Sequence, residues 1–212
     1  MRGGLFLVIE GIEGSGKTTQ AKRLADWLEQ RGVPYLLTRE PGGTPVGEEV
    51  RRLLLEGGPL DARTELLLLL SARSALVREV IGPALSDGRV VVADRFELST
   101  LAYQAWGRGL PLEAVRELNA FATGGLRPDL TILLAVPRQT GESRRAARSV
   151  QDRIEGAGAE FHERVAEAYL RLVESEPGVE TVDGTAGPAA VHAALLAVLH
   201  SRFPGTFGNT QG

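Results

Sequence analysis

Cysteine is absent from the 212 residues, and lysine occurs only at Lys17 and Lys22, so arginine carries nearly all of the positive charge. Without a thiol the chain can form no disulfide and no thiolate metal site, and it has no thiol nucleophile. Chemistry that depends on cysteine is therefore excluded.

Long hydrophobic runs and an excess of one charge are also missing. The apolar stretch near the N-terminus, LFLVIE, is too short for a signal peptide, and no run approaches the length that spans a membrane. The formal net charge of −3 gives no general attraction to nucleic acid or to a membrane surface. We therefore expect a cytoplasmic protein whose partners are small molecules.

The sequence does contain an alternation of apolar strands and helical segments. With 212 residues, 43% of them hydrophobic, it suits one domain, 1–212, with a full core. The predicted strands are 5–10, 34–38, 89–94, 130–136 and 179–183. The predicted helices are 17–31, 45–56, 61–87, 97–106, 111–122, 138–148, 155–176 and 187–202, and the tail 204–212 is expected to be frayed.

The predicted strands are continuous apolar runs, which is typical of parallel strands covered on both faces. Strand–helix alternation along the chain predicts a three-layer, doubly wound α/β fold with a parallel five-stranded sheet. Ligands of such folds bind at the carboxyl ends of the strands, so functional residues are expected in the segments that follow them.

The segment after the first strand, Gly11–Thr18, fits the pattern G-x-x-x-x-G-K-[ST] of a phosphate-binding loop. Its glycines let several backbone N–H groups converge on one anion at the positive end of a helix. Lys17 is expected to reach the β- and γ-phosphates of a triphosphate, and the Thr18 hydroxyl to bind Mg²⁺. The alternative is a glycine-rich turn with an incidental lysine, but the position between a strand and a helix favours the phosphate loop. The predicted ATP-binding residues are Gly11, Ile12, Glu13, Gly14, Ser15, Gly16, Lys17, Thr18 and Thr19.

Two further strand ends carry arginines, in TREPGGT (38–44) and DRFELSTLAYQ (94–104). Arg39 and Arg95 could clamp a second phosphate, because a planar guanidinium matches phosphate oxygens in bidentate fashion. Asp94 closes an apolar strand, where a carboxylate can hold Mg²⁺ through water. The simpler alternatives are a Pro-Gly turn with an incidental ion pair between Arg39 and Glu40, and an Asp-Arg pair that caps a helix. Two phosphate sites side by side favour phosphoryl transfer between nucleotides.

These segments resemble the thymidylate kinase family. EGIEGSGKTTQ, REPGGT, DRFELSTLAYQ, RPDLTILL and DRIE (152–155) have that family's order and spacing, over most of the chain. The resemblance implies transfer of the γ-phosphoryl group of ATP to dTMP, giving dTDP, with Mg²⁺ and without a covalent intermediate. It also implies the P-loop nucleoside monophosphate kinase core, with sheet order 2-3-1-4-5, and a homodimer, for which the leucine-rich helix 61–80 is the expected interface.

The resemblance also implies roles for single residues. Arg39 and Arg95 match positions that bind the dTMP phosphate, and Thr18 and Asp94 match the Mg²⁺ site. Arg73 matches an arginine that reads the thymine edge, and the alternative is a surface residue at the end of a leucine-rich helix. The full dTMP set is Glu13, Arg39, Pro41, Leu69, Arg73, Arg95, Phe96, Ser99, Thr100, Tyr103 and Gln104.

One position departs from the family pattern. Four residues before Arg73 the family carries an aromatic that stacks on the base, whereas this chain has Leu69 within a leucine run. We expect a looser thymine pocket in which Leu69 gives apolar contact without stacking, or in which another aromatic such as Phe96 compensates.

The phosphate loop also lacks an arginine for the transferring phosphoryl group, and its Glu13 is acidic. In the family this charge comes from the loop itself or from a lid that closes over ATP, and a small lid is predicted at about 142–155. The alternative for this segment is a solvated basic helix. The predicted catalytic residues are Lys17, Arg95, Arg144, Arg148 and Arg153.

Other function classes fit less well. A regulatory GTPase needs N-K-x-D and D-x-x-G, but neither Asn119 nor Asn209 precedes a lysine, and D-x-x-G does not occur. A DNA-handling ATPase would need a basic face. A kinase for another small acceptor and an inactive nucleotide-binding scaffold stay open. The two acceptor-side arginines favour a phosphorylated acceptor, and Lys17, Thr18 and Asp94 together argue against a scaffold.

Overall fold

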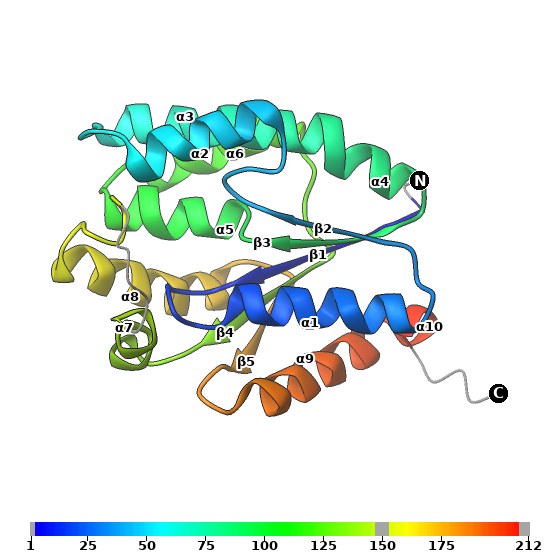
Figure 1. Cartoon of the computed structure of the whole chain (residues 1–212). Helices are drawn as coiled ribbons and strands as arrows, with labels where there is room; N and C mark the ends of the chain where they lie inside the picture. The colour runs from blue at the N-terminus through cyan, green and yellow to red at the C-terminus, as the bar shows by residue number, and fades with distance from the viewer. Residues whose placement is uncertain (1–2, 147–152, 208–212) are drawn as a thin grey trace.

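The computed structural model describes residues 3–146 and 153–207. Its centre is a parallel sheet of five strands: β1 (Leu5–Glu10), β2 (Tyr35–Arg39), β3 (Val90–Asp94), β4 (Leu130–Ala135) and β5 (Val179–Asp183). The order is β2-β3-β1-β4-β5, which confirms the predicted topology. In Figure 1 the carboxyl ends of the strands point to the left.

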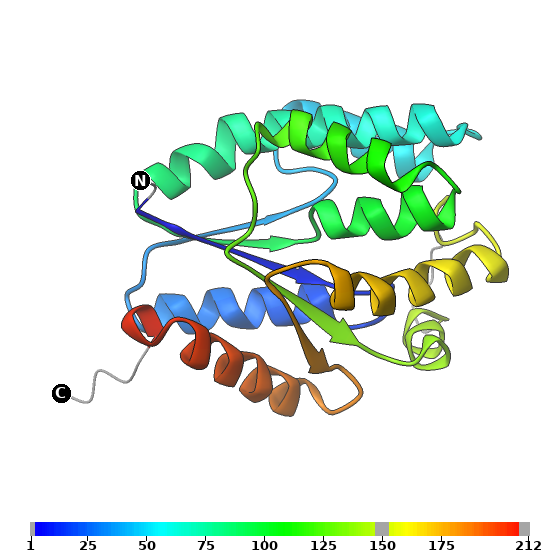
Figure 2. The ribbon, with the colours of Figure 1, turned by 180° about the vertical axis from the view of Figure 1, so that it is seen from behind.

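The three inner strands, β1, β3 and β4, are buried almost throughout, which explains their continuous apolar runs, whereas the edge strands β2 and β5 are mostly half-buried or exposed. On β1, Leu7 and Ile9 pack in a core with helices α1 (Lys17–Gln30) and α9 (Pro188–Arg202). The intervening Phe6 and Val8 pack in a second core on the opposite face. Figures 1 and 2 show α1 and α9 together on one side of the sheet and α2, α3 and α6 beyond the other.

The remaining helical segments lie mostly where periodicity predicts them. They are α2 (Pro45–Glu56), α3 (Ala62–Leu76), η1 (Val77–Ile81), α4 (Gly82–Ser86), α5 (Glu97–Thr100), η2 (Leu101–Gly107), α6 (Leu112–Thr123), α7 (Arg138–Ala146), α8 (Ala159–Ser175) and α10 (Pro204–Phe207). Two starts have side-chain caps. The Thr44 hydroxyl accepts the N–H of Gly47 before α2, and the Asp61 carboxylate accepts two N–H groups before α3.

The predicted helix 61–87 is not one regular α-helix. Its middle, η1, is a π-helical turn in which the N–H of Gly82 donates to the carbonyl of Val77, five residues back. Pro83 follows at once, and a proline lacks the N–H for an α-helical bond and crowds the preceding turn. The wider turn accommodates it. The segment 97–106 likewise passes from α5 into the π-helical η2.

Two other boundaries differ from the prediction. The helix expected from 155 begins only at Ala159, because Gly158 has a φ of 89°, which a right-handed helix cannot include. The expected frayed tail instead starts with α10, whose Phe207 is buried with its ring 5.8 Å from Trp27. The rest of that tail lies outside the described residues. Within the described chain, no helix combines the length and apolarity needed to cross a membrane.

Candidate active site

A cavity of about 410 Å³ opens at the carboxyl ends of the strands. Its walls come from the loop between β1 and α1, the end of β2 and the segment after it, α2, α3, the segment from Asp94 through η2, and residues 154–155. Most of the predicted site residues meet there: Glu13, Gly14, Gly16, Lys17, Thr18, Thr19, Arg39, Pro41, Leu69, Arg73, Asp94, Arg95, Ser99, Thr100, Tyr103 and Gln104. Six other predicted residues do not line it: Gly11, Ile12, Ser15, Phe96, Arg144 and Arg153.

The phosphate loop approaches α7 so closely that glycine is required at the contact. Gly14 has a φ of 75°, and a Cβ on it would lie 2.2 Å from the carbonyl oxygen of Gly141. Within the loop, the Lys17 ammonium donates to the carbonyl of Ile12 at 2.8 Å. Burial and the charge of Arg95 lower the pKa of Lys17 to about 8. The glycine backbone of the loop and the ammonium-bearing Lys17 thus line the cavity together.

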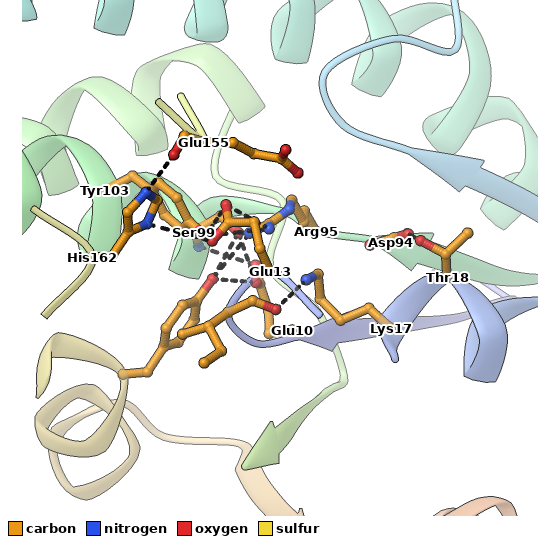
Figure 3. Close-up of polar contacts among 12 residues, drawn as sticks. Glu10, Glu13, Lys17, Thr18, Asp94, Arg95, Ser99, Tyr103, Glu155 and His162 are labelled. Carbon is orange, nitrogen blue, oxygen red and sulfur yellow. Dashed lines mark hydrogen bonds and ion pairs between the residues drawn. The ribbon is translucent and has the colours of Figure 1, made fainter. Parts of the chain in front are cut away.

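Thr18 and Asp94 meet on one side of the cavity. The Thr18 hydroxyl donates to Asp94 Oδ2 at 2.5 Å, and both residues line the cavity (Figure 3). Among the residues that the structure describes, no three acidic or histidine side chains cluster in a way that could hold a metal. Magnesium in phosphate sites takes few protein oxygens and fills its shell with phosphate oxygens and water. The two oxygen donors therefore fit Mg²⁺ beside a bound phosphate.

Arg95 is held in an unusual conformation directly after β3. Its φ is 73°, a left-handed value that costs energy for a residue with a side chain. Its guanidinium donates to the Ser99 hydroxyl at 2.9 Å and to the Tyr103 hydroxyl at 3.2 Å, and it lies 3.4 Å from Glu13. Figure 3 shows these side chains converging on one wall. The backbone strain is thus compensated by bonds that aim the arginine into the cavity.

Glu13 joins the phosphate loop to this wall. The Tyr103 hydroxyl donates to Glu13 Oε1 at 2.5 Å, and His162 Nδ1 lies 3.8 Å from the other carboxylate oxygen. Burial raises the pKa of Glu13, but Arg95 and Lys17 outweigh it and leave the pKa below its usual value. Burial also raises the pKa of Tyr103 well above its usual value, so the phenol stays protonated. Glu13 is therefore a carboxylate at neutral pH.

Glu10 is a structural member of the site that pattern analysis missed. It is fully buried and accepts the backbone N–H groups of Phe96 and Ser99 at 2.9 and 3.0 Å. It also accepts the hydroxyls of Ser99 at 2.7 Å and Tyr169 at 2.8 Å. A single charged residue that ends the apolar run of β1 was a signal that could have revealed it.

Arg73 is the most heavily bonded side chain of the cavity. Its Nε–H and one Nη2–H donate to Glu40, and its two Nη1–H groups donate to Thr100 Oγ1 and Asn119 Oδ1. Only one N–H, on Nη2, is not used by these bonds. Phe96 is wholly buried beneath the guanidinium, with its ring centroid 5.0 Å from Arg73 Cζ. Phe96 therefore contacts the arginine rather than the cavity, and the surface alternative for Arg73 is wrong because the residue is buried.

The ion pair considered between Arg39 and Glu40 is not formed. Arg39 instead pairs with Glu48 at 3.0 Å, with its side chain about half exposed, while Glu40 is buried against Arg73. Glu48 also accepts the backbone N–H of Gly43. Arg39 and Glu40 thus both line the cavity, Arg39 with a half-exposed side chain and Glu40 with a buried one.

Gln104 contacts a buried carboxylate behind the cavity. Its Nε2 donates to Glu65 Oε1 at 2.8 Å, and its own Oε1 is buried with no hydrogen-bond partner in the part of the chain that is described. The predicted lid residue Arg153 also reaches Glu65, at 2.8 Å, and its Nε donates to the carbonyl of Leu54 at the end of α2. Sequence patterns had not indicated Glu65, which lies in an apolar helix 39 positions from Gln104.

The other predicted lid residues divide between described and undescribed parts of the chain. Arg144 on α7 donates to the carbonyls of Gly184 and Thr185, in the loop after β5, at 2.9 and 3.0 Å. Arg148 lies outside the described residues.

A parallel sheet of this order, a phosphate loop and a second, arginine-lined wall facing it define a P-loop nucleoside monophosphate kinase. Comparison with known proteins narrows the class. The chain belongs to the thymidylate kinase family, whose model matches residues 9–195.

Relatives and a solved structure agree with this assignment. Thymidylate kinases of Synechococcus sp. (strain JA-2-3B'a(2-13)) and Geobacter sulfurreducens are 47% and 45% identical, over 94% and 95% of this chain and 96% and 99% of their own lengths. The crystal structure of thymidylate kinase from Ehrlichia chaffeensis superposes with a TM-score of 0.78 at 31% identity, covering 92% of this chain and 98% of that one. The activity of the family is phosphorylation of dTMP to dTDP with ATP as donor, which is the reaction of this enzyme.

Proposed function

We propose that Arg73 and Gln104 read the thymine of dTMP in the cavity while ATP lies on the phosphate loop. The observation that carries this proposal is a pair of unused hydrogen-bonding groups on two side chains that line the cavity. One is the buried Oε1 of Gln104, an acceptor, and the other is the remaining Nη2–H of Arg73, a donor. Thymine presents the complementary pair, an N3–H donor beside an O4 acceptor.

The rest of the cavity suits the sugar and phosphate of a nucleotide. Arg95 and Arg39 are proposed to bind the dTMP phosphate, because guanidinium groups bind phosphate in bidentate fashion. The half-exposed pair of Arg39 with Glu48 can exchange for a phosphate at little cost, since exposed ion pairs are weak. Tyr103 is bonded to Glu13 of the phosphate loop, beside Arg95, and we place the deoxyribose against this pair. Leu69 supplies the apolar wall for the base.

Mg²⁺ would be held by Thr18 and Asp94. Bound there, it supplies positive charge that neutralises the phosphate oxygens of ATP. Lys17 is placed to give up its bond to the carbonyl of Ile12 and to contact the β- and γ-phosphates. The ammonium then exchanges a weak backbone acceptor for a charged one.

The transfer itself needs little from the protein beyond position and charge. The dTMP phosphate oxygen attacks the γ-phosphorus, that oxygen–phosphorus bond forms, and the bond to the β–γ bridging oxygen breaks, so that ADP leaves. The dTMP phosphate attacks as an anion, so no side chain has to remove a proton. We propose that Lys17 and Arg95 stabilise the charge in transit, with a lid arginine, foremost Arg148, completing the set.

A coupled assay of ADP release across dTMP, dUMP, dCMP, dAMP, dGMP and UMP tests the proposal. Turnover should be highest with dTMP, and dUMP should be the best of the others because it has the same base edge. A dCMP rate equal to that of dTMP would contradict the reading of the base by Arg73 and Gln104. Omission of Mg²⁺ with chelator present should abolish turnover and return on Mg²⁺ addition.

We also propose a homodimer that forms through α2, α3 and α6. Large apolar side chains are exposed on these three helices: Val46, Leu53, Leu67, Leu118 and Phe121. Figure 1 shows the three helices packed together at one side of the molecule, away from α1 and α9. Exposed apolar clusters of this kind mark protein–protein contacts. The exposed apolar residues thus include Leu67 on α3, the leucine-rich helix expected at the interface.

A further inference from the structure

We propose that Glu65 is a positioning residue that makes the acceptor site selective for thymine over cytosine by fixing the orientation of the Gln104 amide. The proposal rests on the proposed placement of dTMP, with its base against Gln104 and Arg73. Glu65 itself lies behind the cavity wall and does not line it.

The contact between the two side chains has only one possible polarity. Glu65 is wholly buried on α3, and its Oε1 lies 2.8 Å from Gln104 Nε2. An ionised carboxylate can only accept hydrogen bonds, so the amide must turn its NH₂ group towards Glu65. The amide oxygen of Gln104 is thereby left as the group available to a ligand, and it is buried without a partner among the described residues. An unsatisfied buried acceptor costs free energy until a donor reaches it.

The carboxylate is kept ionised and immobile by two arginines. Arg108 donates to its two oxygens at 3.1 and 3.0 Å, and Arg153 Nη2 lies 2.8 Å from Oε2. Burial raises the pKa of Glu65, but the hydrogen bonds from Arg108 and Gln104 outweigh it and leave the pKa below its usual value. Glu65 therefore has no proton to donate at neutral pH. Rotation of the Gln104 amide would turn its oxygen towards the carboxylate, which is unfavourable because both groups are acceptors.

The fixed amide distinguishes the two pyrimidines. Thymine offers N3–H to the Gln104 oxygen and O4 to the unused N–H of Arg73. Cytosine presents the reverse, an N3 lone pair and an exocyclic NH₂ group. The Gln104 oxygen would then face another acceptor, and the Arg73 N–H would face another donor. Each such unpaired buried contact disfavours binding by a factor of about 10 or more. A rotated Gln104 amide would remove one of the two mismatches.

The test is Glu65→Gln, with kcat/KM and equilibrium binding measured for dTMP and dCMP. A neutral amide at 65 can both donate and accept, so it permits either orientation of Gln104. We expect the ratio of dCMP to dTMP in kcat/KM and in affinity to rise about tenfold over wild type. A folded variant that keeps the wild-type ratio would overturn the proposal.

Arg108→Gln is the matched control. It removes one partner of Glu65 from the same cluster but leaves the bond between Glu65 and Gln104, so it should lower the melting temperature without changing the ratio. If Glu65→Gln does not fold, because Arg108 and Arg153 then share no buried carboxylate, the double variant Glu65→Gln/Arg108→Gln removes one charge of each sign. The same rise in the ratio of dCMP to dTMP is expected in this double variant.

A wild-type enzyme that does not prefer dTMP to dCMP would instead contradict the proposed placement of the base.

Discussion

At the scale of single residues, burial and neighbouring charge decide which protonation states the site offers to a nucleotide. Lys17 is nearly buried beside Arg95, and its pKa is lowered from 10.5 to about 8. Bound phosphate would reverse that effect by placing negative charge at the ammonium. The affinity for ATP and the charge of Lys17 should therefore be linked.

We predict that ATP affinity falls about tenfold between pH 7 and pH 9, because a group with a pKa near 8 is about 90% deprotonated at pH 9. Equilibrium titration with ATP at constant ionic strength measures it. Lys17→Arg is the control, since a guanidinium keeps its charge over this range and should give weaker but pH-independent affinity. An equal pH dependence in both proteins would contradict the assignment of this effect to the charge of Lys17.

The stability of the unliganded protein should depend on pH with the opposite sign to the ATP affinity. Between the two pKa values the unfolded chain binds more protons than the folded one, so the contribution of Lys17 to the free energy of unfolding increases as the pH rises from about 8 to 10.5.

Leu69 gives a second prediction at this scale. Because Leu69 lines the cavity, Leu69→Ala should weaken dTMP binding several-fold by removing apolar contact, and Leu69→Phe should strengthen it by supplying a ring that stacks on the base. Calorimetric titration with dTMP, with ATP affinity as the unaffected reference, measures both. If neither substitution changes dTMP affinity, residue 69 does not contact the base.

At the scale of elements, the described ends of the predicted lid are anchored to different parts of the fold. On α7, Arg144 contacts the loop after β5, whereas Arg153 is bonded to the end of α2 and to Glu65 on α3. The anchored Arg153 would have to exchange a buried carboxylate for a phosphate before it could act in transfer. The sequence predicts Arg148 and Arg153 as the leading candidates for this charge, and the anchoring of Arg153 leads us to place Arg148 first.

We predict that Arg148→Ala lowers kcat at least tenfold and changes dTMP affinity little, since charge at the transferring group acts mainly in the transition state. Arg153→Ala should lower kcat as well, but it should also lower the melting temperature, because it leaves Glu65 with one cation fewer. Steady-state kinetics and thermal unfolding of Arg144→Ala, Arg148→Ala and Arg153→Ala separate these effects. Near wild-type kcat in all three and in the triple variant would leave the charge to Lys17, Mg²⁺ and Arg95.

At the scale of the whole molecule, the distribution of exposed apolar residues predicts the assembly. Phe121 on α6 is 86% exposed and Leu67 on α3 is 56% exposed, on helices that pack against each other. Phe121→Asp should convert a dimer into a monomer, because a charge buried in an apolar interface is costly. Sedimentation velocity measures the change. Leu170→Asp on α8, where the leucine is 64% exposed, is the matched control and should leave the dimer intact. A monomeric wild-type protein would contradict the proposed interface.

The sequence by itself determined the elements whose signals are local. Gly11–Thr18 predicts a phosphate loop because bare backbone, one ammonium and one hydroxyl must be close together in the chain to surround a phosphate. The inner strands were recognisable because both of their faces are buried, and the ends of the predicted strands then indicated Arg39, Asp94 and Arg95.

Only the tertiary structure decided which buried polar groups pair. Glu40 could be matched to its neighbour Arg39 or to a distant cation, and it pairs with Arg73, 33 residues away. The Glu65 contact to Gln104 and the Glu10 contacts to Ser99 and Tyr169 have no local pattern either. The physical reason is that a buried charge must be satisfied by whatever group the packing brings within hydrogen-bond distance. That distance depends on how helices and strands stack, and spacing along the chain does not encode it.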